Sequence, residues 1–146
     1  MIRAISAAQT RPLRQSVLRP HQAANELVYP GDDAEQSIHL GWFDENNTEP
    51  GAVLSAFPQF GEPPIADCDW RLRGMAVSPV LRGRGVGRHL MLALFERLSQ
   101  RAASGLWCNA RTSAAGFYTR LGLHEVGARF ELPDIGEHVR MARIFE

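Results

Sequence analysis

The sequence predicts a mixed α/β fold, in which a mostly antiparallel sheet of about six to seven strands is flanked by about four helices. An apolar strand pattern over 70–79 gives way to a helical pattern from Gly85, and a second apolar strand follows over 106–111. This order predicts two parallel strands joined by a helical crossover. Antiparallel strand pairs are expected before and after this unit. The length of 146 residues fits one domain over 1–146.

The first part of the chain predicts a short strand over 2–6 and a short helix. We expect Thr10 to be the N-cap of that helix, Pro12 to lie in its first turn and Pro20 to stop it. Residues 21–36 read as a loop with about one helical turn.

A hairpin should follow. The stretches 37–47 and 50–58 have strand patterns joined by turn residues, and a loop leads from them to Trp70.

The strand over 70–79 is predicted to alternate between two faces until Pro79 ends it. One face should carry Trp70, Leu72, Gly74 and Ala76, and the other Arg71, Arg73, Met75 and Val77. The helix after Gly85 repeats apolar residues at helical spacing, from Val86 to Leu98.

The last part of the chain predicts a short helix and a closing pair of strands. Thr112 or Ser113 should cap the helix, and Gly122 suits the position after its end. The stretches 124–132 and 137–145 read as antiparallel partners around a turn.

Composition limits the classes of function. Sixteen basic residues balance sixteen acidic ones, so the net charge is zero. The net charge therefore gives no reason to expect nucleic acid or an anionic membrane as partner. Cys68 and Cys108 form neither a disulfide framework nor a zinc pattern, so both are expected to be reduced core thiols. No apolar run reaches a membrane span and no segment resembles a signal peptide, so we expect a cytoplasmic protein.

The densest local signal is the stretch "LRGRGVGRHLM", in which three glycines and three arginines precede the helix. The first turn of a helix has N–H groups without intrahelical acceptors, and the helix dipole adds positive charge there. Glycines allow a ligand to approach those N–H groups closely. The turn therefore predicts an anion site that suits a phosphate or pyrophosphate.

Spacing decides between phosphate-binding patterns. The dinucleotide pattern G-x-G-x-x-G fails, because Arg88 stands at its third glycine, and no P-loop lysine is present. The pattern that fits is R-x-x-G-x-G, made by Arg82, Gly85 and Gly87 between a strand and an amphipathic helix.

The stretch "RGMAVSPVLRGRGVGRHLM" resembles the acetyl-CoA-binding motif of the GNAT superfamily of N-acetyltransferases, Gln/Arg-x-x-Gly-x-Gly/Ala at a strand–helix junction. Two further blocks resemble the family: "FYTRLGL", which matches its F-Y-x-x-L-G-F/L helix, and "GEHVRM", which is similar to the final strand of a subset, with Glu137 in place of proline. The resemblance covers roughly 70–145.

The resemblance departs from the family at one cofactor contact. Many members carry asparagine seven residues before the tyrosine, but Arg111 stands there and Asn109 lies two residues earlier. Either residue is a candidate for that contact.

The resemblance implies the acyl-CoA N-acyltransferase fold and direct acetyl transfer from acetyl-CoA to an amine, without a metal. It implies that the Val77 N–H stabilises the thioester oxyanion and that Tyr118 protonates the leaving thiolate. The cofactor-binding residues it implies are Met75, Ala76, Val77, Arg82, Gly83, Arg84, Gly85, Val86, Gly87, Arg88, Asn109, Arg111 and Phe117.

The general base and the acceptor stay open at this point. The candidates for the base are Asp67, Asp69, Glu137, His138, His39 or a water chain. Arg14 and Arg19 are candidates to bind a substrate carboxylate, and Asp32 and Asp33 to bind an ammonium, although solvated surface charge is the favoured interpretation of all four. The resemblance implies a small-molecule or peptide amine as the acceptor.

Other functions compete with this one. The main alternative is a CoA-binding sensor or interaction module with little catalytic activity. A site for another nucleotide at the same turn is a further alternative, and nucleic-acid binding is the weakest because the basic charge clusters at one turn. The sequence leaves a homodimer open.

Overall fold

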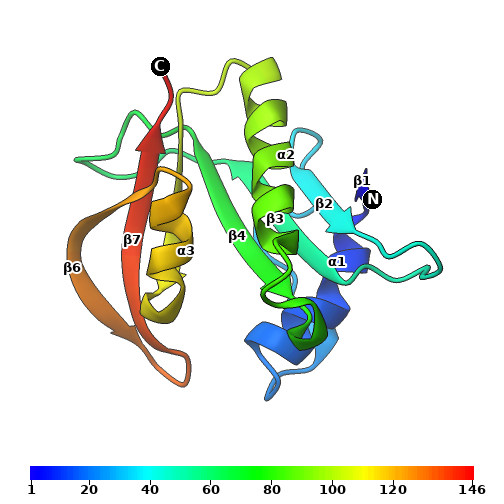
Figure 1. The fold of residues 1–146 in the computed structure, drawn as a ribbon. Helices are drawn as coiled ribbons and strands as arrows, with labels where there is room; N and C mark the ends of the chain where they lie inside the picture. The colour runs from blue at the N-terminus through cyan, green and yellow to red at the C-terminus, as the bar shows by residue number, and fades with distance from the viewer.

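The computed structural model describes residues 1–146 as one seven-stranded sheet with helices on both faces (Figure 1). The strands are β1 Ile2–Ala4, β2 Ile38–Trp42, β3 Ala52–Pro58, β4 Trp70–Val77, β5 Gly105–Arg111, β6 His124–Leu132 and β7 Gly136–Ile144. Their order in the sheet is β1-β2-β3-β4-β5-β7-β6, and only β4 and β5 pair in parallel. The predicted mixed, mostly antiparallel sheet is confirmed.

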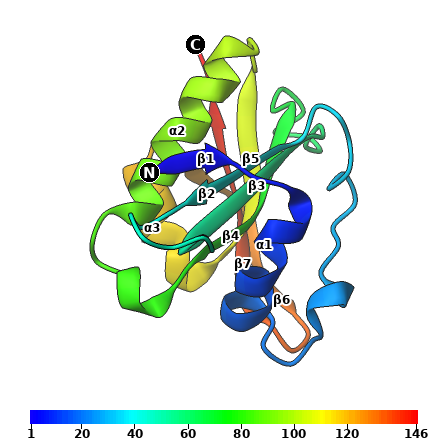
Figure 2. The same cartoon turned by 90° about the vertical axis from the view of Figure 1, so that its right-hand side faces the viewer.

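The structure has three α-helices, where about four helices were expected. They are α1 Ala7–Leu13, α2 Val86–Gln100 and α3 Ala115–Arg120. A π-helical turn, η1 Arg14–Leu18, continues α1 directly, and three 3-10 turns are η2 Ala24–Glu26, η3 Pro79–Leu81 and η4 Thr112–Ala114. Helices α2 and α3 cover one face of the sheet, and α1 with η1 covers the other (Figures 1 and 2).

The main core lies between the sheet and the pair α2–α3. Leu90, Leu94 and Leu98 of α2 are fully buried there against strand residues such as Leu54 and Leu72. Burying a leucine side chain stabilises a fold by about 1.5–3 kcal/mol. The predicted apolar stripe of α2 is therefore what fixes this helix, and with it the glycine turn at its start, to β4.

Two predicted helix caps are wrong. Ser6 caps α1: its hydroxyl accepts from the Gln9 N–H, and the Gln9 side chain accepts from the Ser6 N–H. This is a capping box, and its S-x-x-Q signature was present in the sequence. Thr10 lies inside the helix and donates to the Ala7 carbonyl. No side chain caps α3, and the Thr112 hydroxyl donates to the Glu137 carbonyl instead.

A β-bulge at Gly74 corrects the predicted alternation of β4. Arg73 lies opposite Ser55 of β3, but Ala76 lies opposite Val53, so one residue of β3 faces two of β4. Gly74 has a φ of +65°, a conformation that favours glycine.

The bulge exchanges the two faces of the strand beyond it. Met75 packs against the main core beside Leu72, and Val77 packs with Val86 of α2. Arg71 and Arg73 were expected to share a face with Met75 and Val77. They lie on the α1 side instead, because Arg73 is opposite Ser55, whose side chain contacts Arg14.

Strands β4 and β5 separate shortly after they begin to pair. Their parallel register covers only two positions, where Trp70 lies opposite Leu106 and Arg71 opposite Trp107. Beyond these residues no paired positions join the two strands, and a cavity lies between them.

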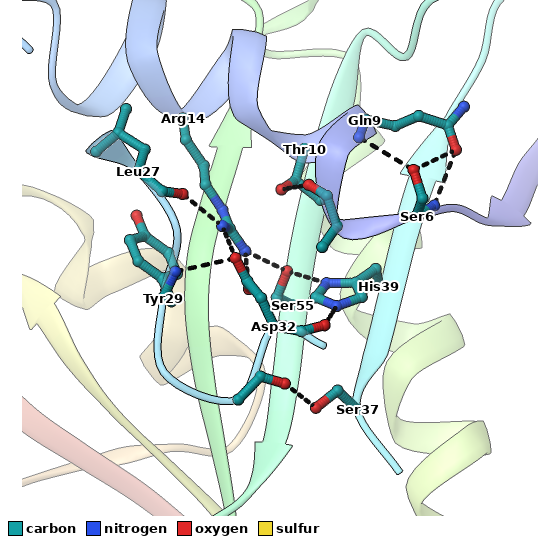
Figure 3. Close-up of polar contacts among 12 residues, drawn as sticks. Ser6, Gln9, Thr10, Arg14, Leu27, Tyr29, Asp32, Ser37, His39 and Ser55 are labelled. Atoms are coloured by element: carbon teal, nitrogen blue, oxygen red, sulfur yellow. Dashed lines mark hydrogen bonds and ion pairs between the residues drawn. The ribbon is translucent and has the colours of Figure 1, made fainter. Parts of the chain in front are cut away.

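A buried polar network joins η1, the loop between η2 and β2, and the strands β2 and β3 (Figure 3). The guanidinium of Arg14 donates to both carboxylate oxygens of Asp32 at 2.7 and 2.9 Å, and also to Ser55 Oγ and the Leu27 carbonyl. His39 joins Ser55 Oγ to the Asp32 carbonyl. Arg14 is fully buried and Asp32 is 4% exposed.

This network overturns the interpretation of Arg14 and Asp32 as solvated surface charges or substrate ligands. The two side chains bind each other, and both are removed from solvent. Burial alone raises the pKa of Asp32, but the hydrogen bonds from Arg14 and from the Tyr29 N–H outweigh it and hold this pKa below its ordinary value. Asp33, next along the chain, is exposed as expected.

Replacing Asp32 with asparagine should lower the free energy of unfolding at pH 7 by about 3–5 kcal/mol, because it leaves the Arg14 charge buried without a counterion. A carboxyl whose folded pKa is depressed stabilises the fold above its unfolded pKa, and this contribution disappears as the pH falls through the folded value. Urea unfolding measured from pH 7 to pH 3 should therefore show that the free energy of unfolding falls less with decreasing pH in Asp32→Asn than in the wild type. Asp33→Asn is the control, and an equal loss in the two variants would contradict the assignment.

Replacing Gly74 with alanine should lower the free energy of unfolding by about 1–3 kcal/mol, through strain at positive φ and crowding. A Cβ atom there would lie 3.0 Å from Arg14 Nε and 3.1 Å from the Tyr29 ring. Gly127→Ala is the matched control, because Gly127 has a φ of +78° but open space around it. Urea unfolding should show a larger loss for Gly74→Ala. Equal losses would mean that crowding adds nothing.

Candidate functional site

The opening between β4 and β5 contains a cavity of about 190 Å³. Its walls come from the diverging halves of both strands, from the end of η1, and from single residues of α3, β6 and β7. Residues that line it include Arg71, Arg73, Met75, Cys108, Asn109, Arg111, Tyr118 and His138. The cavity therefore collects side chains from parts of the chain more than 100 residues apart.

Tyr118 enters this cavity from α3. The residue is 7% exposed, its ring packs edge to face on Phe117 at 5.1 Å, and its hydroxyl makes no hydrogen bond within the protein. Burial raises its pKa well above the ordinary value, and the nearby Cys108 adds to this effect. The phenol is therefore protonated at neutral pH and has a proton to donate.

A second hollow, of about 440 Å³, lies over the glycine turn. Gly83 and Gly85 have φ values of +81° and +77°, and a Cβ at either would meet no atom within 4 Å. Gly85 is the N-cap of α2, so the N–H groups of the first helical turn face open space without intrahelical acceptors. The lining consists of Val77, Leu81, Arg82, Gly83, Gly85, Val86, Gly87, Arg88, Phe117, Arg120 and Leu121.

The hollow is cationic and meets the cavity at a shared wall. It is lined by Arg82, Arg88 and Arg120 and by no acidic residue. A Cβ on Gly87 would lie 3.2 Å from Met75 Cε, in the cavity wall, and 3.4 Å from the Phe117 ring. Gly87 therefore lets the helix start approach β4 and α3 closely, which brings the hollow next to the cavity.

Most of the predicted site residues line one of these two spaces. Ala76 and Arg84 line neither: the bulge places Ala76 opposite Val53, and Arg84 is exposed beside the turn. Arg111 donates to the Leu18 carbonyl at 2.6 Å, whereas Asn109 Oδ1 is buried without any hydrogen-bond partner. Asn109 thus has an acceptor atom free for a ligand N–H.

Of the five candidate bases, His138 is the one that lines the cavity. Its Nδ1 lies 2.8 Å from the Gly136 carbonyl, an acceptor, so Nδ1 donates and Nε2 of the neutral ring is left as the acceptor. His39 belongs to the buried network, and Asp69 accepts from the N–H groups of Ser104 and Gly105. Asp67 and Glu137 are exposed outside the cavity.

Sequence reasoning missed three of the arginines that line the two spaces: Arg71, Arg73 and Arg120. Arg71 and Arg73 were considered only as part of one face of a strand, although that strand ends at the site, and no role was considered for Arg120. Burial is the main cause that lowers the pKa of three cavity arginines: the pKa of Arg71 falls to about 10, and those of Arg73 and Arg111 lie below their ordinary value. All three remain charged at neutral pH.

Two other classes of site find no support in the structure. No group of three or more His, Cys, Asp or Glu side chains is placed to hold a metal ion. No helix combines the length and the apolar character that a membrane span requires.

Comparison with known proteins agrees with this geometry. Residues 60–144 match the model of an acetyltransferase (GNAT) domain. The chain is 33% identical over 141 residues to YitI of Bacillus subtilis (strain 168), described as an uncharacterized N-acetyltransferase, and the match covers 96% of this chain and 93% of that protein.

Solved structures share the whole fold. Escherichia coli ElaA superposes with a TM-score of 0.77 at 18% identity, over 98% of both chains. An aminoglycoside 6'-N-acetyltransferase complexed with coenzyme A superposes with a TM-score of 0.73 at 16% identity, over 99% of this chain and 96% of that one. The family match, the relative and the fold agree, and the chain therefore belongs to the GNAT family of N-acetyltransferases, which are acyl-transferring enzymes.

Proposed function

We propose that this enzyme transfers an acetyl group from acetyl-CoA to a primary amine of a small molecule or peptide, by direct attack in a ternary complex. The observation that carries the proposal is the junction of two spaces: a cationic helix start beside a cavity that holds a protonated, unpartnered tyrosine. The solved relative with coenzyme A has the same fold, which supports the cofactor assignment.

The glycine turn fits a pyrophosphate. Its free N–H groups lie at a helix N-terminus, the glycines leave space above them, and Arg82 and Arg88 line the hollow. Arg120 adds a third guanidinium that the sequence motif does not include. These groups would hold the cofactor, whose thioester supplies the acetyl group.

Strand β4 is suited to receive the thioester. The Ser78 N–H donates to the Gly51 carbonyl at 2.9 Å, on the β3 side. Because paired and unpaired positions alternate along an antiparallel ladder, the Val77 N–H points toward the opposite edge, where β5 has diverged. We assign this N–H to the carbonyl oxygen of the thioester, where it would stabilise developing negative charge.

Tyr118 is our candidate general acid. A thiolate leaving inside the cavity would be poorly solvated. Burial raises the pKa of the Cys108 thiol in the same cavity wall, and the same desolvation would raise the pKa of a leaving CoA thiol. A proton from the Tyr118 phenol would therefore stabilise the departing sulfur.

His138 is our candidate for the group that accepts the proton from the amine, directly or through water. It lines the cavity, and its hydrogen bond to the Gly136 carbonyl leaves Nε2 free to accept. The neutral amine attacks the thioester carbon and the C–N bond forms, His138 takes the proton that the positively charged nitrogen must lose, the C–S bond breaks, and Tyr118 protonates the sulfur. The chain's own groups thus account for both proton transfers.

Gly85→Glu should abolish acetyl-CoA binding, a loss of at least about 100-fold by calorimetry, because a carboxylate would face the pyrophosphate. Gly127→Glu is the matched control, since Gly127 also has positive φ and open space, but lies on β6. The control should bind acetyl-CoA normally. Unchanged affinity in Gly85→Glu would refute the assignment of the glycine turn.

Tyr118→Phe should lower kcat by about 100-fold and change the KM for acetyl-CoA by less than threefold, because only the donated proton is lost. The hydroxyl makes no hydrogen bond within the protein, so the melting temperature should not fall. Thiol release with a reactive amine measures turnover. A variant with unchanged kcat would mean that Tyr118 is a packing residue.

A further inference from the structure

The cavity between β4 and β5 is lined by four arginines on its α1 side. Arg71 and Arg73 come from β4, Arg111 from β5, and Arg19 from the residue that follows η1. Arg73 lies opposite Ser55, and Arg111 donates to the carbonyl of Leu18 in η1, so both side chains are on the face that α1 and η1 cover. No aspartate or glutamate lines the cavity.

None of these four guanidinium groups has a carboxylate partner. The three ion pairs of the structure are Arg14–Asp32, Arg129–Glu125 and Arg129–Glu137. Arg19 and Arg111 bond only to the Leu18 carbonyl, and Arg71 and Arg73 only stack, on Trp107 at 4.7 Å and on Tyr29 at 4.2 Å. All four are half-buried, and Arg71 Nε is buried without a partner.

Half-buried cations without counterions carry a free-energy cost, which an anion in the cavity would offset. The groups that face the arginines from neighbouring elements do not supply it. His138, Tyr118, Tyr29 and Cys108 are not carboxylates, Arg140 adds a further positive charge, and the Asp32 carboxylate is bound by Arg14. The cavity thus presents the donors of an anion site, and no acidic side chain of the protein lines it.

We propose that the acceptor of this enzyme is a small amine that also carries an acidic group, a carboxylate or a phosphate, which the arginines of this cavity bind. The proposal rests on the proposed acetyl transfer and names its substrate class. Guanidinium groups suit these anions because their planar forks donate two parallel hydrogen bonds.

The same charges favour the reactive form of the amine. A nearby positive charge disfavours an ammonium and lowers its pKa, so an amine held beside the arginines loses its proton more readily than in water. Asn109 Oδ1, buried in the same wall without a donor, can accept from the amine N–H. The cavity thus holds the acid end by charge and the amine end by a neutral acceptor.

The site also disfavours other classes of acceptor. A polyamine or an aminoglycoside would bring several positive charges beside at least four guanidinium groups, without a carboxylate to receive them. At about 190 Å³ the cavity is smaller than the roughly 300–1,000 Å³ of pockets for drug-sized ligands, which favours a small acceptor.

The first test compares amino acids and their carboxamides as acceptors. L-Alanine, L-glutamate and O-phosphoethanolamine are matched with L-alaninamide, L-glutaminamide and ethanolamine, and spermidine is the polycation. Thiol release gives kcat/KM, and calorimetry on the enzyme saturated with CoA gives affinity without turnover. At least one acid should exceed its neutral counterpart by about tenfold or more in both measurements.

The second test changes the arginines. Arg73→Gln and Arg71→Gln should each reduce the preference for acid over neutral counterpart by about tenfold, and Arg73→Lys should restore part of it. The KM for acetyl-CoA should change by less than twofold in all three variants. Arg3→Gln, at an exposed arginine of β1, is the control and should leave every value unchanged.

A panel in which no acid binds more tightly than its neutral counterpart overturns the proposal, and so does one in which spermidine is the best acceptor. Such a result with intact acetyl-CoA binding leaves the proposed acetyl transfer standing. Failure of acetyl-CoA itself to bind would instead refute the proposed function, and the substrate class with it.

Discussion

The β-bulge at Gly74 is the constraint on which both halves of the site depend. One extra residue in β4 turns Arg71 and Arg73 toward the α1 side, and Met75 and Val77 toward α2. A regular strand would put all four side chains on one face. With the bulge, a single strand supplies cations to the cavity and apolar contacts to the glycine turn.

The buried Arg14–Asp32 pair supports the bulge from the α1 side (Figure 3). Arg14 Nε and the Tyr29 ring lie where a side chain on residue 74 would have to go. Buried ion pairs rarely add stability over apolar packing, because desolvation cancels much of their attraction. Here the role of the pair is to position its neighbours, because it joins η1, the loop that carries Asp32 and β3 behind the bulge. The Tyr29 ring in addition stacks on both Arg14 and Arg73.

Sequence patterns predicted most of the helices and strands, and the part of the site formed by the glycine turn and the Phe117–Tyr118 helix. Local patterns were sufficient for the glycine turn and for the Phe117–Tyr118 helix, because spacing along the chain determines them. The exchange of faces after Gly74 was not predicted. A bulge depends on how two strands pair, whereas the predicted alternation of side chains assumes a regular strand without a bulge. Arg14 and Asp32 were misjudged because a buried ion pair between residues 18 apart has no local signature.

All sixteen basic residues of this chain are arginines, and this choice keeps the cations of the cavity charged. Burial, together with the charges of Arg73 and Arg140, lowers the pKa of Arg71 to about 10, and the group still keeps its charge at neutral pH. The pKa of a lysine starts lower, at about 10.4, so the same surroundings would favour its uncharged form more strongly. Half-buried cations without counterions can therefore persist here as guanidinium groups. A chain with zero net charge thus keeps a strongly positive interior wall, because its acidic residues lie elsewhere.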